Sequence, residues 1–305
     1  MQLIYEGVDI TQRVDIHRCI HRDLSRGRCD SAEIEFEHAA EWYAWQPEQG
    51  ERIEITHDGY STGTLYLNTI LPEGGRYRLI AASLPPGGGQ RAWQSFCKMS
   101  LGEIMRSCAA QCGMEYSIYG LDEGQLYPYI ERQDESCAAF ISRLMEMEGA
   151  VLKCVNGKMA GIALAYAQDI APAQEIEIGP EQGAARFMHM GERKYGGIIL
   201  KTPYAEAFAL DSAASGQAHI SLTQYPAMDN LQAGRWARGL LLTHNRQAEA
   251  LEFTSELNIG MTALARIDIS GGTDADGEWI VDEAEHDFIR ERTRTRLMRC
   301  IRSIS

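Results

Sequence analysis

The sequence lacks several patterns that would identify a common class of protein. It has no run of about eighteen apolar residues, the length that a helix needs to span a bilayer, so we expect no membrane span. Its first residues, MQLIYEGVDITQRVD, contain no basic segment followed by an apolar block, so we expect no secretory signal. It also has no fixed-period repeat and no low-complexity segment, which argues against a solenoid or a disordered chain.

The eight cysteines include no CxxC pair, which argues against a structural zinc site. Without a secretory signal, free thiols in a reducing cytoplasm are the simplest interpretation. Cys108 and Cys112 lie four residues apart on a predicted helix, where their Cβ directions are nearly parallel and suit a disulfide poorly. We therefore expect packed or surface thiols, and we predict no metal and no cofactor.

The composition is that of an acidic globular protein. The net charge of −14 argues against a general nucleic-acid binder, so no sequence-specific nucleic-acid partner is expected. A hydrophobic share of 45% is ordinary for a chain with a real core. A length of 305 residues suits two or three domains.

Residues 1–83 predict short strands separated by glycine turns. Ala32, Ile34 and Phe36 alternate with glutamates, which is typical of a half-buried strand with an acidic outer face. Further strands are expected at 2–5, 14–20, 52–57, 64–70 and 76–83. Strands of this length and spacing favour a small barrel or sandwich.

Residues 84–168 predict a smaller α+β domain that begins after a proline- and glycine-rich boundary. Apolar residues three and four apart predict one helix after Ser100 and a second helix from Asp134, its expected N-cap, to Gly149. The expected strands are 114–119, 150–155 and 158–164, the last two joined by an Asn156-Gly157 hairpin turn.

Residues 169–305 predict a second β-barrel domain with an inserted helix at about 229–244. Residues 203–219 are rich in alanine, serine and glycine and predict a long loop. The expected strands are 184–189, 197–202, 219–224, 248–257, 263–270, 278–283 and 288–301. The predicted fold class is therefore mainly β, with two β-barrel modules joined by a smaller α+β domain.

Three blocks of the sequence resemble a known family. The first contains Cys29-Asp30-Ser31, Ile34, Phe36, Trp42, Trp45, Pro47, Gly50, Gly63-Thr64-Leu65-Tyr66 and Ala82-Ser83-Leu84-Pro85. The second contains Glu135-Ser136, Phe140, Arg143-Leu144 and Glu148-Gly149. The third contains Ala233, Arg235, Ala237, Arg238, Leu240, Gly260, Gly277-Glu278-Trp279-Ile280-Val281 and His286. In this order they resemble the contractile-tail baseplate hub proteins of the phage late control D family, which are related to the N-terminal hub part of VgrG spike proteins.

The resemblance implies a structural baseplate hub and no enzyme activity. Such hubs carry two β-barrels per chain and form a homotrimer, a ring with pseudo-sixfold symmetry that adapts a hexameric tail tube to a trimeric spike. The implied partners are the tail tube protein, the spike protein and other baseplate proteins. The implied location is the bacterial cytoplasm during assembly, then a phage virion or contractile injection particle. Because the chain stops at Ser305 without a β-helical needle, we expect the spike to be a separate polypeptide.

An arginine stripe is the candidate subunit or partner interface. Four arginines alternate along the last predicted strand of an otherwise acidic chain: Arg290, Arg292, Arg294 and Arg296. Two interpretations stay open. The charges either form a solvated or edge-protecting face or contact an acidic neighbouring subunit or spike.

Other candidate sites have a structural alternative. His17, Cys19 and His21 alternate along a predicted strand. They either bind zinc or form a strand face that packs against a neighbour. The segment from Asp274 to Glu285 begins like a calcium loop, but a β-turn explains it better. The glycine runs 87–89 and 271–272 lack the lysine and hydroxyl of a phosphate loop, and no serine lies in a G-x-S-x-G elbow.

Two alternative functions remain open at this point. One alternative is a tail-tip peptidoglycan-cleaving enzyme that uses paired carboxylates. The candidate carboxylates are Glu131, Asp134, Glu135, Glu146, Glu148, Asp274, Asp276 and Glu278. No pair stands in a recognisable catalytic motif. Trp42, Tyr43 and Trp45 could form a carbohydrate-binding platform, although a core or interface anchor is the more ordinary role of clustered aromatics.

Overall fold

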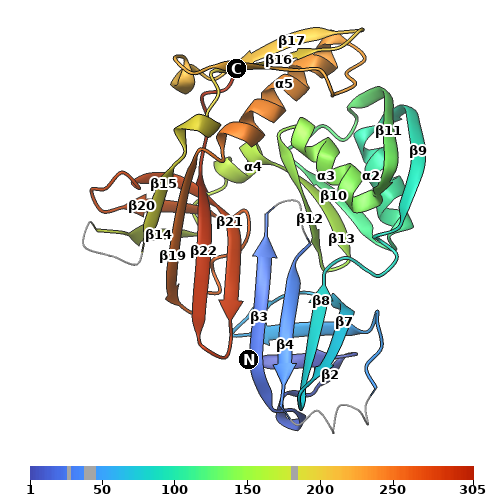
Figure 1. Cartoon of the computed structure of the whole chain (residues 1–305), viewed down its shortest axis with the longest axis vertical. Coiled ribbons are helices and arrows are strands. Elements are labelled where there is room, and N and C mark those ends of the chain that lie inside the picture. The colour runs from blue at the N-terminus through green and yellow to red at the C-terminus, as the bar shows by residue number, and fades with distance from the viewer. Residues whose placement is uncertain (26–28, 38–45, 180–184) are drawn as a thin grey trace.

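The computed structural model describes residues 1–25, 29–37, 46–179 and 185–305, and strands dominate them (Figure 1). Within these residues, fourteen strands join into one large sheet. Its N-terminal strands are β1 (Gln2–Tyr5), β2 (Val8–Asp9), β3 (Ile16–Leu24), β4 (Ser31–Phe36), β5 (Arg52–His57), β6 (Tyr60–Ser61), β7 (Leu65–Glu73) and β8 (Arg76–Ala82). Its C-terminal strands are β14 (Gln174–Glu177), β15 (Arg186–His189), β19 (Glu249–Glu256), β20 (Arg266–Ser270), β21 (Gly277–Asp287) and β22 (Arg292–Arg299).

Each half of the large sheet curls around its own core. Ala32, Ile34 and Phe36 are buried in the first core, as their alternation predicts, together with side chains from β1, β3, β5, β7 and β8. Trp279 is central to the second core, where Phe187 packs edge-on against it at 6.1 Å between ring centroids. The mainly β fold class is thereby confirmed.

One strand pair joins the two halves, and we call this junction the seam. β3 pairs antiparallel with β21, with His21 opposite His286 and Arg22 opposite Glu285. The main path through the sheet runs β15-β19-β22-β21-β3-β4-β8-β7-β5-β1-β2. Strands more than 250 residues apart in the chain therefore become neighbours (Figure 1). The domain boundaries at 83 and 168 remain a prediction.

The α+β part contains helices α2 (Leu101–Gln111), α3 (Cys137–Met147) and α4 (Leu164–Asp169). Its strands are β9 (Arg91–Ser100), β10 (Glu115–Tyr119), β11 (Leu126–Ser136), β12 (Ala150–Val155) and β13 (Lys158–Ala163). Ser100 caps α2 with a reciprocal capping box that includes Glu103. The predicted cap Asp134 is wrong. It lies in β11 with a φ of 49°, and the Ser136 side chain accepts the Ala139 N–H instead.

The segment between β15 and β19 forms a second small layer. It contains β16 (Gly197–Lys201), β17 (Glu206–Leu210), β18 (His219–Leu222) and α5 (Asn230–Asn245). Three short 3-10 turns complete the elements, η1 (Thr11–Arg13), η2 (Gly191–Arg193) and η3 (Ser212–Ala214). The predicted loop at 203–219 is wrong, because β17 pairs with β16 through it. Its alternating alanines face α5, so small residues here mark a packed strand.

Helix α5 belongs to the same core as the α+β part. Trp236, Leu240 and Leu241 are buried together with Phe140 and Leu144 of α3. The close approach needs a glycine, because a Cβ on Gly239 would lie 2.2 Å from the carbonyl oxygen of Met147. The helix predicted at 229–244 therefore forms, and it covers α3 rather than the second sheet core.

Candidate functional site

A buried ion triad spans the seam and the α+β part. Lys153 of β12 places its Nζ 2.5 Å from Asp23 Oδ1 and 2.6 Å from Asp30 Oδ2. The Lys153, Asp23 and Asp30 side chains are 11%, 8% and 4% exposed. The second oxygen of Asp23 accepts the Ala263 N–H at 2.9 Å, and Asp30 accepts the Leu24 N–H at 3.0 Å. The triad thereby joins three stretches of chain.

The two carboxyls of the triad differ in acidity. Burial, together with the nearby Asp23 charge and against the pull of Lys153, raises the pKa of Asp30 to about 6. Burial also opposes ionisation of Asp23, but the Lys153 ammonium outweighs it and holds the pKa of Asp23 below its usual value. Asp30 is therefore the carboxyl that takes up a proton more readily.

A second buried pair fastens α5 to the seam. Arg246 donates from Nη2 to Asp282 Oδ1 at 3.0 Å, with side chains only 4% and 7% exposed. The Ser25 hydroxyl donates to the same carboxylate at 2.6 Å. Truncating one partner of such a pair leaves the other charge in a low-dielectric site, which is costly.

Two histidines occupy the seam opposite each other. The rings of His21 and His286 are nearly parallel, with centroids 6.5 Å apart. Nδ1 of His21 lies 2.7 Å from the Tyr60 hydroxyl, and Nδ1 of His286 lies 3.0 Å from Thr293 Oγ1. Burial lowers the pKa of His21 to about 3 and lowers that of His286 as well. Both rings are therefore neutral at pH 7.

The three residues His17, Cys19 and His21 do not share one face. A register shift between Ile16 and Arg18 turns His17 to the surface, where it lies 3.3 Å from Glu37. Cys19 and His21 are buried. Across the described ranges, no group of three or more His, Cys, Asp or Glu is arranged to hold a metal ion.

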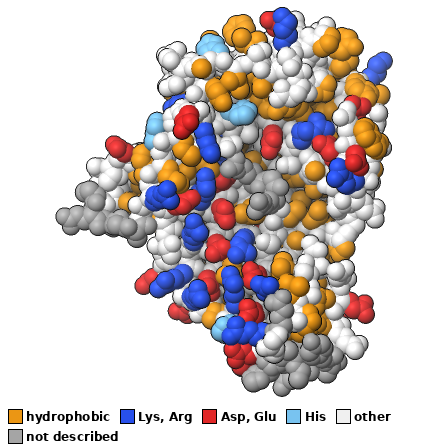
Figure 2. Space-filling view, in the orientation of Figure 1, with side chains coloured by type: hydrophobic (Ala, Val, Ile, Leu, Met, Phe, Trp, Pro, Cys, Tyr) orange, Lys and Arg blue, Asp and Glu red, His pale blue; other side chains and the backbone are white. Residues whose placement is uncertain are grey.

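The outer side of the sheet across the seam is a second notable surface, which we call the charged face. It is formed by outward side chains of β8, β4, β3, β21, β22 and β19, where arginines and glutamates alternate from strand to strand (Figure 2). Its ion pairs include Arg22 with Glu285 at 2.7 Å, Arg76 with Glu35 at 2.8 Å, Arg18 with Glu33 at 3.3 Å and Arg78 with Glu33 at 3.6 Å.

The arginine stripe lies at one end of the charged face. Arg292, Arg294 and Arg296 are on β22, whereas Arg290 lies in the turn before it, so the predicted strand begins too early. β22 pairs with β19 on one side and β21 on the other, so it is not an edge strand. A solvated face and a partner interface both remain as interpretations of the stripe. Arg290 is 81% exposed and Arg294 is 67% exposed, although Arg294 still reaches Glu252 at 3.6 Å.

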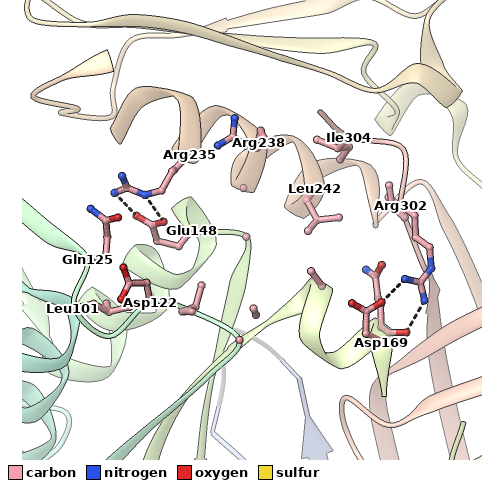
Figure 3. Close-up of a pocket in the computed structure, with 18 of the residues that line it drawn as sticks. Leu101, Asp122, Gln125, Glu148, Asp169, Arg235, Arg238, Leu242, Arg302 and Ile304 are labelled. Carbon is pink, nitrogen blue, oxygen red and sulfur yellow. Dashed lines mark hydrogen bonds and ion pairs between the residues drawn. The ribbon is translucent and has the colours of Figure 1, made fainter. Parts of the chain in front are cut away.

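A pocket of about 470 Å³ lies where α5 and the C-terminal segment meet the α+β part, including its helix α4. Arg235 of α5 reaches Glu148 on one side, and Arg302 reaches Asp169 on the other, with Leu242 between them (Figure 3). Glu148 also accepts from Tyr127 at 2.8 Å and Trp236 at 2.7 Å.

Several of the carboxylates predicted as catalytic candidates hold structural contacts. Glu148 is the member of that set that lines the pocket, and its arginine, tryptophan and tyrosine partners hold it in place. Glu135 is held by Arg143 at 2.9 Å. Asp276 accepts the N–H of Gly272 at 2.9 Å, which is a turn and not a calcium loop. The aromatic platform Trp42, Tyr43 and Trp45 falls outside the described residues.

The thiols lie largely inside the protein. Cys108 and Cys112 are buried and free, in keeping with packed thiols. Hydrogen bonds from these two thiols, and the Arg132 guanidinium 2.9 Å away, lower the pKa of Cys137 to about 3. In the parts of the chain that are described, no helix is both long and apolar enough to span a bilayer.

The sequence does not predict the ion triad. Lys153 is the only charged residue in the strand AVLKCV, and a lone charge in an apolar strand is a signal for a buried partner. Nothing in the sequence pairs it with Asp23 or Asp30, because these lie 130 and 123 residues away.

Solved structures match this fold over nearly the entire chain. The prophage MuSo2 43 kDa tail protein from Shewanella oneidensis aligns with TM-score 0.72 and 12% identity, covering 98% of this chain and 97% of that one. The tail protein from Neisseria meningitidis MC58 aligns with TM-score 0.75 and 10% identity, covering 97% and 95%. The E. coli c3393 protein, described as a type VI secretion component similar to T4 tail proteins gp27 and gp5, aligns with TM-score 0.59 and 11% identity, covering 98% and 77%.

No family model matches the sequence, and no curated protein matches it either. At such low identities the structural matches establish the fold. That fold is mainly β with several sheets and few helices, and it is the fold of phage tail proteins.

Proposed function

We propose that this chain is a structural baseplate hub of a phage tail or contractile injection system. The observation that carries the proposal is the end-to-end match to two tail proteins, which leaves almost no part of either chain unaligned. The similarity to a type VI secretion component extends the proposal to injection systems. The protein would be assembled in the bacterial cytoplasm and then form part of the particle.

Three copies would form a ring between a hexameric tail tube and a trimeric spike. The large sheet has two separately cored halves in each chain, so three chains would present six β units around one axis. Such a ring could contact a sixfold partner on one side and a threefold partner on the other. Other baseplate proteins would bind its outside.

The arginine stripe would bind an acidic surface of the neighbouring subunit or the spike. Arg290 and Arg294 are mostly exposed, and the whole chain carries a net charge of −14, so acidic surface is available on a second copy. Charge complementarity of this kind favours the correct partner and orientation.

Native mass spectrometry of the purified chain, alone and with its tube and spike partners, tests the ring. The expected mass is that of three chains, and electron microscopy of the particle should place a ring between tube and spike. A chain that remains monomeric with both partners present would contradict the proposal.

The double variant Arg292→Glu with Arg294→Glu tests the stripe. It should keep the monomer fold, judged by circular dichroism, but lose trimer or spike binding. Arg91→Glu is a matched control, because Arg91 is as exposed as Arg294, at 67%, but lies at the start of β9. An unchanged trimer mass and unchanged spike binding in the double variant would remove the stripe from the interface.

A further inference from the structure

The ion triad Lys153, Asp23 and Asp30 has the parts of a self-modification site. It places one primary amine against two carboxyls inside the protein, with Nζ at 2.5 Å from Asp23 and 2.6 Å from Asp30. Against the effect of burial, the two aspartates raise the pKa of Lys153, so the side chain is an ammonium at rest and becomes a nucleophile only after it loses a proton. Contact at this distance removes much of the entropic cost of bringing two reacting groups together. A simple ion pair needs one carboxylate for one ammonium, so the second carboxyl calls for an explanation.

We propose that Lys153 forms an intramolecular isopeptide bond with Asp23, with Asp30 as the proton carrier. The Nζ–Cγ bond of the amide forms and the Cγ–Oδ1 bond of Asp23 breaks. The ammonium gives up two protons, the first through Asp30, and both leave with Oδ1 as one water molecule. The step is a condensation, so it needs no oxidant, reductant or co-substrate.

The contacts of Asp23 suit its proposed role as the electrophile, the carboxyl whose carbon is attacked. Its Oδ2 accepts the Ala263 N–H at 2.9 Å, and a fixed backbone donor stabilises the negative charge that develops on that oxygen during attack. Its Oδ1 lies beside Nζ and is the oxygen that departs.

The contacts of Asp30 suit its proposed role as the group that carries the proton away from Lys153. Both of its oxygens contact Nζ, at 2.7 and 2.6 Å, so it can receive a proton from the amine without moving. Burial raises the pKa of this carboxyl to about 6, close to the range in which general acids and bases work best. A hollow of about 610 Å³ is lined by Cys29 and Ser31, the two chain neighbours of Asp30, and by Leu24.

The bond would fasten two parts of the fold covalently. Asp23 lies on β3 at the seam and Lys153 lies on β12 of the α+β part, 130 residues further along the chain. Such a link would keep these parts together under a pulling force even when their non-covalent contacts yield. The inference is independent of the proposed hub function, because the bond either forms or does not form in the purified chain.

Intact-mass spectrometry of the denatured full chain is the first test. The expected mass is lower than the sequence mass by one water molecule, in a fraction that grows during incubation at neutral pH. A mass equal to the sequence mass after prolonged incubation overturns the proposal.

Tryptic mapping identifies the partner. Modified Lys153 resists trypsin, so the expected product joins peptide 144–158 to peptide 23–26. A link to peptide 29–52, which carries Asp30, would overturn the assignment of Asp23 as the electrophile.

Three variants separate the roles. Lys153→Arg keeps the charge but has no acylable amine, so its mass should equal its sequence mass. Asp23→Asn should give the same linked peptide with loss of ammonia in place of water. Asp30→Asn should stop or greatly slow the loss of water, and unchanged linkage in that variant would overturn its role as proton carrier.

Discussion

The seam and the arginine stripe are both rich in charge, but their charges have different neighbours. At the seam, Arg246 and Asp282 are 4% and 7% exposed and lie 3.0 Å apart. On the stripe, Arg290 and Arg294 are 81% and 67% exposed, with partners at 3.8 and 3.6 Å. Charges that are buried with their partners hold a chain together, whereas exposed charges with distant partners remain available to another molecule. The comparison teaches that the stripe, and not the seam, is the place to look for assembly.

Removing a seam charge is expected to have the largest effect. Arg246→Ala should lower the free energy of unfolding by about 3–5 kcal/mol, because Asp282 loses the arginine that compensates its burial. Urea unfolding followed by circular dichroism measures this. The matched exposed pair is Arg91 with Asp134, also 3.0 Å apart, and Arg91→Ala should change the free energy far less. Equal losses in the two variants would erase the distinction between buried and exposed charge.

The contact of α5 with the α+β part should be the next most sensitive point. Gly239→Ala places a Cβ 2.2 Å from a backbone oxygen, so the variant should lose about 1–3 kcal/mol of unfolding free energy as α5 is pushed outward. Gly234→Ala is the control on the same helix, where a Cβ meets nothing within 4 Å and alanine should be neutral or stabilising. Thermal unfolding of both variants measures the difference. A Gly239→Ala variant as stable as the unchanged protein would contradict the close packing of α5 on α3.

Acid should weaken the seam by a smaller amount. Because the pKa of His21 is lowered from 6.5 to about 3 and that of His286 is lowered too, the unfolded chain binds protons that the folded chain cannot. Stability is therefore complete above pH 6.5 and falls as the pH drops, by about 1 kcal/mol between pH 7.5 and pH 6. Below pH 6 the raised pKa of Asp30 works in the opposite direction, so the loss should become shallower.

Urea unfolding at several pH values measures this dependence. The His21→Gln variant, which cannot be protonated in either state, should show a flatter profile over the same range. A profile with the wild-type slope in this variant would place the titrating groups elsewhere in the molecule.

Added salt should change stability least of all these tests, and it should distinguish the seam from the arginine stripe most clearly. Raising the salt concentration from about 0.1 M to about 1 M shortens the Debye length from about 10 Å to about 3 Å, which screens exposed charges far more than buried ones. The free energy of unfolding should change little, while any assembly through the stripe should weaken. Sedimentation at the two salt concentrations measures assembly, and salt-resistant assembly would point to an apolar interface.

Local features were predictable where neighbouring residues decide them. The alternation at Ala32, Ile34 and Phe36 correctly places a strand and its buried face, and α5 begins after its cap Asp229, close to the predicted start. Local chemistry misled at Asp134, because Ser136 offers an equally good cap two residues closer to the apolar stripe. It also misled at 203–219, where alanines that look like loop residues are small because α5 packs on them.

The sequence by itself determined many of the short strands, the two principal helix starts after Ser100 and Asp229, the acidic net charge and the arginine stripe. These depend on periodicity, capping and charge, all of which act over a few residues. The sequence did not predict β9, β11, β14 or β17. Only the tertiary structure decided that β3 pairs with β21, that Lys153 meets two aspartates, and that the stripe lies on an interior strand. The first two contacts join positions more than a hundred residues apart, and β19 and β22 pair across 44 residues at Glu252 and Arg296. No local preference specifies which of many similar strands or charges will meet.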